Sequence, residues 1–243
     1  MPKKKKSKIF NFLLFFTISA IVFFITYNLS ARQVGIIDKY NVDYKIIDYA
    51  SGKYIVNPEI AINGSEKFDN IINRLKPLSA ITGTFYDAER KPLGDILSNG
   101  KIINRGNQRQ AIAFTANGKI FFLERKPNTK IDWTGYKSGI ACGPRLVRSG
   151  QKSIDVKKDG FSQSAETKTA WRCAIGATKD NKLILCAVSD SITLDILADI
   201  MLELGACNAI NLDGGSMAGF YSDGEIKVQP VQSINNVIAV YKK

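Results

Sequence analysis

The sequence predicts an α+β domain with a mixed, mainly antiparallel sheet and two principal helices, preceded by one N-terminal transmembrane helix. Two observations predict the domain. Apolar runs repeatedly flank turn signals such as Asn117-Gly118 and Asp223-Gly224, and only one strand-helix-strand unit is apparent. Such turns connect antiparallel strands, whereas a parallel sheet needs crossover connections. An uncharged apolar run near the N-terminus predicts the transmembrane helix.

The apolar run extends from Ile9 to Ala31 without a charged side chain. Its 21 residues up to Leu29 span roughly 30 Å as a helix, which is the thickness of a bilayer core. A signal peptide has a shorter apolar region and small residues before its cleavage site. A cut after Ala31 has Leu29 where a small residue is required, so we expect an anchor that is not cleaved.

Lysines concentrate ahead of this run, with five among the first eight residues. The positive-inside rule places such an arm in the cytoplasm and the remainder of the chain outside the membrane. The sequence therefore predicts a single-pass protein of the cell membrane with an extracytoplasmic domain. Its expected parts are a basic arm at 1–8, the anchor at 9–31, a linker at 32–44 and the domain at 45–243.

Composition excludes several classes of catalysis. The chain of 243 residues contains no histidine, which excludes a Ser-His-Asp triad, a Cys-His pair and a histidine-bound zinc. It has 34 Lys and Arg against 22 Asp and Glu, but six basic residues lie at or before Arg32, so the remainder has a net charge of +6. That charge suits a phosphate-bearing glycan better than nucleic acid, although surface lysines that keep the domain soluble explain it equally well.

The four cysteines, Cys142, Cys173, Cys186 and Cys207, are widely spaced and form no CxxC pair. This spacing excludes a zinc ribbon and gives no thioredoxin signature. Outside the membrane the cysteines can form disulfides, but each also lies in an apolar run, where a buried thiol packs as a small hydrophobe. Both interpretations stay open.

The first half of the domain contains one predicted helix. Ser65 is its expected N-cap, apolar residues at helical spacing continue to Leu75, and Pro77 ends it. The strands expected in this half are 45–47, 54–56, 78–86, 111–115 and 120–123, of which the last two form a hairpin.

The second half contains the clearest helix. Apolar residues between Ile192 and Leu204 mark one helical face, and Gly205 follows as a C-terminal cap. Residues 151–169 are polar and lysine-rich, which predicts a lid or a disordered insert. The strands expected here are 173–178, 183–188, 209–212, 221–228 and 237–241, with the first two forming a hairpin around Asp180-Asn181.

The segment from Asn211 to Ser216 has the strongest chemical pattern. An apolar strand ends in Asp213, two glycines and a hydroxyl. Paired glycines allow backbone N–H groups to converge on an anion, and the adjacent carboxylate is then placed to act as acid, base, nucleophile or metal ligand. The alternative is a tight turn capped by the Asp side chain.

Two arginines and one aromatic segment are further candidates. Arg145 and Arg172 each follow a short run of small or polar residues at the start of a strand, and a guanidinium group binds phosphate or carboxylate through two parallel hydrogen bonds. Each arginine also fits an ordinary surface ion pair. Phe85 and Tyr86 precede Asp87 at the end of an apolar strand, where aromatic faces suit either sugar rings or the core.

Taken in order, several segments resemble the phosphodiester glycosidase family. The most specific are Arg-Cys-Ala-Ile-Gly at 172–176 and Asn-Leu-Asp-Gly-Gly-Ser at 211–216, with Leu-Gly-Ala at 204–206 between them. Weaker similarities lie at 82–87, 92–94, 142–147 and 193–198, and the resemblance covers roughly residues 45–241. The chain departs from the family pattern at Thr82, at Asp190-Ser191 and at Ile196, and it lacks a third glycine before Ser216.

The resemblance implies hydrolysis of a sugar-1-phosphodiester at the sugar carbon, on a cell-wall or exopolysaccharide glycan. Asp213 is then the essential carboxylate, with Asp190 as its partner, and Arg172 and Arg145 neutralise the phosphate. The other residues expected to bind substrate are Gly214, Gly215, Ser216, Asn211, Asn236 and Thr82. No cofactor is certain, and a divalent cation remains possible.

Two alternatives belong to other classes. One is a metal-dependent phosphodiesterase that cuts the phosphorus–oxygen bond, with Asp87, Asp190 and Asp213 as ligands. The other is a non-catalytic glycan-binding domain that has kept the scaffold, because fold resemblance alone does not establish activity.

Overall fold

The computed structural model describes residues 35–243. The predicted basic arm and transmembrane anchor, residues 1–8 and 9–31, lie outside the described residues. Between Gly35 and the C-terminus, no helix is both long enough and apolar enough to cross a bilayer. The globular fold belongs to the second of two units of the chain, Ile36–Lys243.

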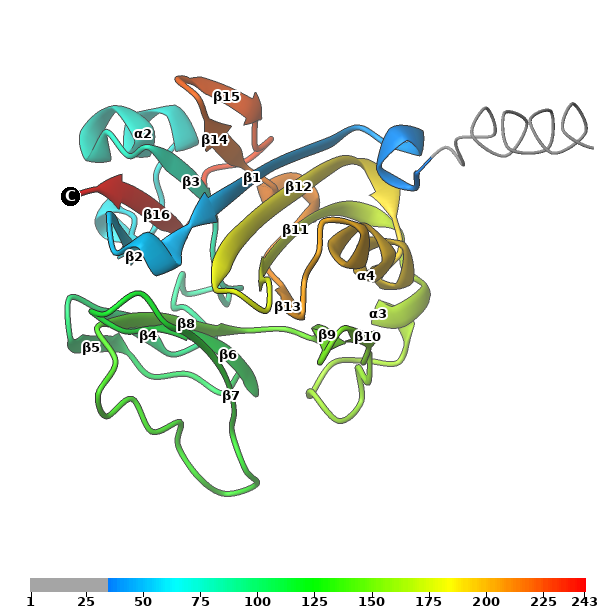
Figure 1. The fold of residues 1–243 in the computed structure, drawn as a ribbon, viewed down its shortest axis with the longest axis horizontal. Helices are drawn as coiled ribbons and strands as arrows, with labels where there is room; N and C mark the ends of the chain where they lie inside the picture. Colours follow the sequence, from blue (N-terminus) through cyan, green and yellow to red (C-terminus); the bar gives the residue numbers. More distant parts are fainter. Residues whose placement is uncertain (1–34) are drawn as a thin grey trace, which may run out of the picture. The chain divides into compact units, whose positions relative to one another are not determined.

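Three antiparallel sheets make up this unit (Figure 1). The first has the order β1 (Val42–Asp48), β12 (Lys182–Ile192), β11 (Ala170–Ala177), β13 (Asn208–Asn211), β9 (Arg145–Arg148) and β10 (Gln151–Lys152). The second has the order β15 (Glu225–Val228), β14 (Phe220–Ser222), β3 (Ser79–Thr82), β16 (Asn236–Lys242) and β2 (Tyr54–Ile60). The third has the order β5 (Lys101–Asn104), β4 (Ile96–Ser98), β8 (Ser138–Cys142), β6 (Gln110–Phe114) and β7 (Ile120–Glu124).

The strand pairing confirms a mainly antiparallel α+β fold. Every strand pair found among the described residues is antiparallel, and the strands are divided among three sheets instead of one. The predicted hairpins form, since β6 pairs with β7 around Gly118, whose φ is +80°, and β11 pairs with β12 around Asn181, whose φ is +60°. These positive φ values explain why turn residues occupy both positions.

The two predicted helices are α2 (Phe68–Leu75) and α4 (Leu194–Glu203), and a single turn, α3 (Ser164–Thr167), lies between them in sequence. Four short 3-10 segments complete the set: η1 (Ile37–Lys39), η2 (Tyr49–Ser51), η3 (Ile62–Gly64) and η4 (Gly215–Met217). Thr193 caps α4 by accepting the Ile196 N–H, and Gly205 follows the helix with φ +87°. Ser65 is not the N-cap of α2, because its hydroxyl accepts a hydrogen bond from Arg90 and the helix begins after Lys67.

The first sheet buries both of its faces. Cys173, Ile175 and Leu185 point into the central core shared with the other sheets, whereas Ala174 and Ile184 point toward α4. This alternation follows from the two-residue period of a strand. No disulfide forms among the described residues: all four cysteines are free, and Cys142, Cys173 and Cys186 are buried.

The segment 151–169 is packed against the domain and is no disordered insert. It contains β10 and α3, and Val156 is only 2% exposed. The predicted strand 78–86 is shorter than expected, because β3 ends at Thr82 and the following backbone bonds to the Asn236 side chain instead of to a strand.

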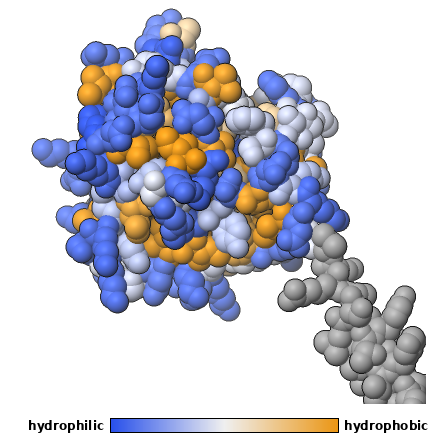
Figure 2. Space-filling model, turned by 90° about the horizontal axis from the view of Figure 1, so that it is seen from above, coloured by the Kyte–Doolittle hydropathy of each residue, from blue (hydrophilic) through white to orange (hydrophobic). Residues whose placement is uncertain are grey.

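Exposed apolar side chains are scattered over the surface. Figure 2 shows one face on which they form small groups among hydrophilic side chains. Val231 and Ile62 are the most exposed large apolar residues described, at 74% and 55%. Scattered exposure of this kind is normal for a folded domain.

Candidate active site

Asp213 lies just beyond the end of β13, between the first and second sheets. The Leu212 N–H donates to the Cys173 carbonyl at 2.8 Å, and the Asp213 N–H donates to the Gly83 carbonyl at 2.9 Å. Two backbone hydrogen bonds thus fix the segment on both sides. The Asp213 side chain is therefore held by the fold and not by a flexible loop.

The Asp213 carboxyl has no cationic partner within the described chain. It is 8% exposed, and its one hydrogen bond comes from the Gly214 N–H at 2.9 Å. Burial raises the pKa of Asp213 to about 7, against a smaller lowering by that hydrogen bond. A buried carboxyl with a pKa near neutrality is typical of a catalytic acid or base.

The two positions after Asp213 favour glycine for different structural reasons. A Cβ on Gly214 would lie 2.6 Å from the Trp171 carbonyl oxygen, so only glycine allows this approach to β11. Gly215 has φ +60° and open space around it. The half-buried Ser216 uses its carbonyl to accept N–H groups from Val231 and Gln232. The turn is therefore fixed, and its role as an anion nest stays a prediction.

A hollow of about 420 Å³ opens near this turn, at Asn211, two residues before Asp213; Asp213 and residues 214–216 do not line it themselves. Arg172 of β11 and Asn211 of β13 line it, so two predicted site residues meet at one cavity. The loop after β3 and the segment before β11 supply the other walls. The remaining lining residues are Phe85, Tyr86, Leu93, Gln108, Pro144, Gly160, Phe161, Ala165, Lys168 and Leu194.

Tyr86 connects the hollow to the segment that follows Asp213. Burial raises the pKa of the Tyr86 phenol, the charge of Arg90 lowers it, and the charge of Asp213 raises it. Its hydroxyl donates to the Met217 sulfur at 3.2 Å. Across the hollow, Phe85 and Phe161 form an edge-to-face pair with ring centroids 5.7 Å apart. Aromatic side chains therefore form part of the wall.

Arg172 carries a charge that no carboxylate neutralises within the described residues. Its guanidinium donates to two backbone carbonyls, those of Ile192 at 3.2 Å and Lys168. Burial lowers its pKa, although a guanidinium remains protonated in proteins. Lys168, at the rim, makes no ion pair in the described part either. The hollow therefore presents unpaired positive charge to an anionic ligand.

Two side-chain amide oxygens of residues that line the hollow are buried and accept no hydrogen bond within the described residues. Asn211 donates from Nδ2 to the carbonyls of Gly143 and Leu212, but its Oδ1 accepts nothing, and neither does Oε1 of Gln108. A buried acceptor without a partner costs about 1–3 kcal/mol. Because both oxygens are themselves buried, a ligand donor reaches them only if the side chains turn toward the hollow.

Thr82 and Asn236 hold the site together by hydrogen bonds to backbone. The Thr82 hydroxyl donates to the Met217 carbonyl at 2.7 Å. The Asn236 amide accepts the Thr84 N–H at 2.7 Å and donates to the Thr84 carbonyl at 2.9 Å. Because both side chains are buried and already bonded, the structure gives them a positioning role, and the predicted contact with substrate stays a prediction.

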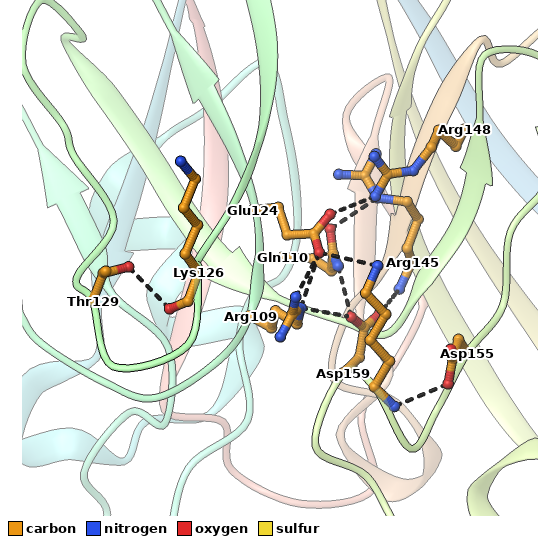
Figure 3. Close-up of polar contacts among 10 residues, drawn as sticks. Arg109, Gln110, Glu124, Lys126, Thr129, Arg145, Arg148, Asp155 and Asp159 are labelled. Atoms are coloured by element: carbon orange, nitrogen blue, oxygen red, sulfur yellow. Dashed lines mark hydrogen bonds and ion pairs between the residues drawn. The ribbon is translucent and has the colours of Figure 1, made fainter.

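Arg145 and Asp190 are engaged away from the hollow. The buried Arg145 donates from Nε to the Gln110 Oε1 at 2.8 Å (Figure 3), and burial lowers its pKa to about 10. Asp190 accepts the backbone and side-chain N–H groups of Asn41 at 2.6 and 2.9 Å. Neither residue lines the hollow, and the substrate-binding role of Arg145 and the catalytic role of Asp190 stay predictions.

The carboxylates suggested for a cation do not gather at one point. Asp87 accepts the Lys91 N–H at 2.8 Å in its own turn. Among residues 35–243, no three acidic or thiol side chains lie close enough to hold a metal ion.

Comparison with known proteins identifies the family. The model of the phosphodiester glycosidase family matches residues 77–241. The chain belongs to this family. The match includes Arg172 and Asp213, so a hydrolase acting on glycosyl phosphodiesters is the class of enzyme to consider. No curated protein matches the chain.

Several solved structures share the fold, among them one from Synechocystis and one from zebrafish. A hypothetical protein from Synechocystis is 18% identical with a TM-score of 0.72; the match covers 83% of this chain and 59% of that one. The catalytic domain of zebrafish N-acetylglucosamine-1-phosphodiester alpha-N-acetylglucosaminidase, auto-inhibited by its pro-peptide, is 20% identical with a TM-score of 0.68; the match covers 83% and 82%. At these identities the likeness establishes the fold alone.

Sequence reasoning missed Gln108 and Lys168. Neither lies in a recognisable motif. Gln108 reaches the hollow because its loop bonds to the Leu93 carbonyl, and Lys168 because its carbonyl accepts a hydrogen bond from the Arg172 guanidinium. The sequence offered one indication for Lys168, which is its position in a polar segment four residues before Arg172, and none for Gln108.

Proposed function

We propose that this phosphodiester glycosidase hydrolyses a sugar-1-phosphodiester at the sugar carbon. The observation that carries the proposal is Asp213, a buried carboxyl with a pKa of about 7 and no cationic partner among the described residues. The next residue, Gly214, packs against the backbone of Arg172, whose unpaired charge lines the hollow. A carboxylate activates water for attack at a sugar carbon, and a guanidinium stabilises the charge on a departing phosphate.

In the proposed reaction, ionised Asp213 takes a proton from water as the water oxygen bonds to the sugar carbon. The bond from that carbon to the phosphate oxygen breaks, and its electron pair leaves with the phosphate as a phosphomonoester. Arg172 stabilises the charge on the departing phosphate. Because phosphate is a good leaving group, the step needs no strong general acid, which suits a chain without histidine.

The sugar is proposed to lie against the unpartnered oxygens of Asn211 and Gln108, which accept hydrogen bonds from its hydroxyls. The proposed setting is the outer face of a cell membrane, with the chain anchored through residues 9–31 and acting on a cell-wall or exopolysaccharide glycan. The uncharged apolar run and the preceding lysines support this setting.

The test compares three forms of the full-length chain on an N-acetylglucosamine-1-phosphodiester, with and without a chelator. The control is Asp48→Asn, because Asp48 is exposed and makes no ion pair in the described part. Wild type and this control should release sugar at equal rates. Asp213→Asn should lose at least 1,000-fold in kcat, on the order expected for removing a general base. Equal rates in the three forms would reject the assignment.

The two alternatives give different results in the same assay. A metal-dependent phosphodiesterase loses activity in chelator, whereas a glycan-binding domain binds a panel of glycosyl phosphodiesters without turning any over.

A further inference from the structure

A basic cluster surrounds Glu124 next to the candidate active site (Figure 3). The Glu124 carboxylate lies 2.8 Å from Arg109, 2.6 Å from Arg148 and 3.2 Å from the ammonium of Lys158. Burial tends to raise the pKa of Glu124, but hydrogen bonds from these three cations outweigh it and lower the pKa to about 2. One ionised carboxylate thus gathers cations from three separate segments.

Positive charge exceeds negative charge around this cluster. A shallow groove beside Glu124 adds Lys126 and Lys130. Neither lysine makes an ion pair within the described residues. The side chains of Arg148 and Lys158 remain 46% and 50% exposed. The cations are Arg109, Lys126, Lys130, Arg148 and Lys158, against the carboxylates of Glu124, Asp132, Asp155 and Asp159.

One chain segment, residues 158–161, links the cluster to the hollow. Asp159, which is 7% exposed, accepts hydrogen bonds from the Gln110 side chain at 2.6 Å and from the Arg145 N–H at 2.8 Å. The next residues, Gly160 and Phe161, line the hollow. Lys158 therefore stands two residues from the wall of the candidate active site, on a segment whose position Asp159 fixes.

We propose that Lys126, Lys130, Arg148 and Lys158 form a basic surface that binds successive phosphates of a polyanionic glycan whose terminal sugar occupies the hollow. This inference rests on the proposed function and names its substrate class, a phosphodiester-linked polymer in preference to a monomeric diester. Each repeat of such a polymer carries one negative charge, so several exposed cations act together on one chain. The binding surface takes no part in the chemical step.

The experiment measures binding by the full-length Asp213→Asn chain, so that substrate is not consumed. The probes are a monomer and a hexamer of N-acetylglucosamine 1-phosphate units joined by phosphodiester bonds, with a neutral chitin hexamer of equal length. We expect the phosphodiester hexamer to bind about tenfold or more tightly than the monomer at low salt, and this preference to fall as salt rises.

Double substitutions that remove two positive charges locate the basic surface. Lys126→Gln with Lys130→Gln breaks no ion pair in the described chain, and Arg148→Gln with Lys158→Gln removes contacts to Glu124. Each pair should weaken hexamer binding about tenfold and leave monomer binding unchanged. The matched control is Lys53→Gln with Lys179→Gln, two exposed lysines that line no described cavity, and it should change neither.

Equal affinity for hexamer and monomer, preference for the chitin hexamer, or equal losses in the control pair would overturn the inference. The proposed function is judged separately, by turnover of the monomer in wild type. Turnover without a length preference rejects only the basic surface, whereas a length preference without turnover rejects only the hydrolase.

Discussion

Asp213 is a carboxyl whose ionisation opposes folding, and this predicts the pH response of an Asp213→Asn variant. Burial raises its pKa from 3.8 to about 7 in the folded state, so between these pH values the folded chain keeps a proton that the unfolded chain has lost. The stability provided by the neutral carboxyl is fully present below about pH 4 and is lost as pH rises through about 7.

The size of the effect follows from the shift in pKa. About three pKa units correspond to about 4 kcal/mol in the free energy of unfolding. For a domain of roughly 200 residues this is about 10 °C in Tm. Asparagine keeps an oxygen for the Gly214 N–H and does not ionise, so the variant should match wild type near pH 4 and melt about 10 °C higher near pH 8.5.

The assay is a thermal ramp on full-length wild type and variant, followed by the fluorescence of Trp133 and Trp171, at half-unit steps from pH 4 to pH 8.5. Asp48→Asn, at an exposed carboxylate, should follow wild type at every pH. If Tm depended on pH in the same way for wild type and Asp213→Asn, or if the variant were less stable at pH 8.5, the reasoning would be refuted. Either result would mean that the charge of Asp213 does not oppose folding.

Three further predictions concern activity and packing. Arg172→Gln should lower kcat/KM for a phosphodiester about 100-fold, with a smaller loss on an uncharged aryl glycoside, because only the former leaves as phosphate; steady-state kinetics on both substrates checks this. Asn236→Ala removes two buried hydrogen bonds to the backbone of Thr84 and should destabilise the chain by about 2–4 kcal/mol, read as a lower urea midpoint. The rate of the wild-type reaction should rise with pH through about 7 as Asp213 ionises, and a pH–rate profile flat from pH 5 to pH 9 would contradict that role.

Local chemistry made much of the fold predictable. Turn residues with positive φ, such as Asn181, fix hairpins whichever sheet they join, and the cap formed by Thr193 fixes the start of α4. The division into three sheets was not predictable from such signals, because β1 and β2 are neighbours in sequence but pair with β12 and β16. That choice depends on long-range packing.

Of the candidate site, the sequence predicted only the part of the hollow whose wall is formed by residues of the two sequence motifs. Arg172 and Asn211 lie on adjacent strands, where Ala174 pairs with Asn211, so the spacing of both motifs brings them to one hollow. Arg145 looked equivalent to Arg172 in sequence, yet it donates to Gln110 in the interior. Which arginine faces a cavity depends on what packs around it, and one sequence does not contain that information.

The most direct test of the account is the fate of oxygen in ¹⁸O-water. Full-length chain is incubated with an N-acetylglucosamine-1-phosphodiester, and both products are analysed by mass spectrometry. Attack at the sugar carbon, with Asp213 activating the water, predicts label in the released sugar and none in the phosphomonoester. Label in the phosphate would show cleavage of the phosphorus–oxygen bond and contradict the proposed chemistry.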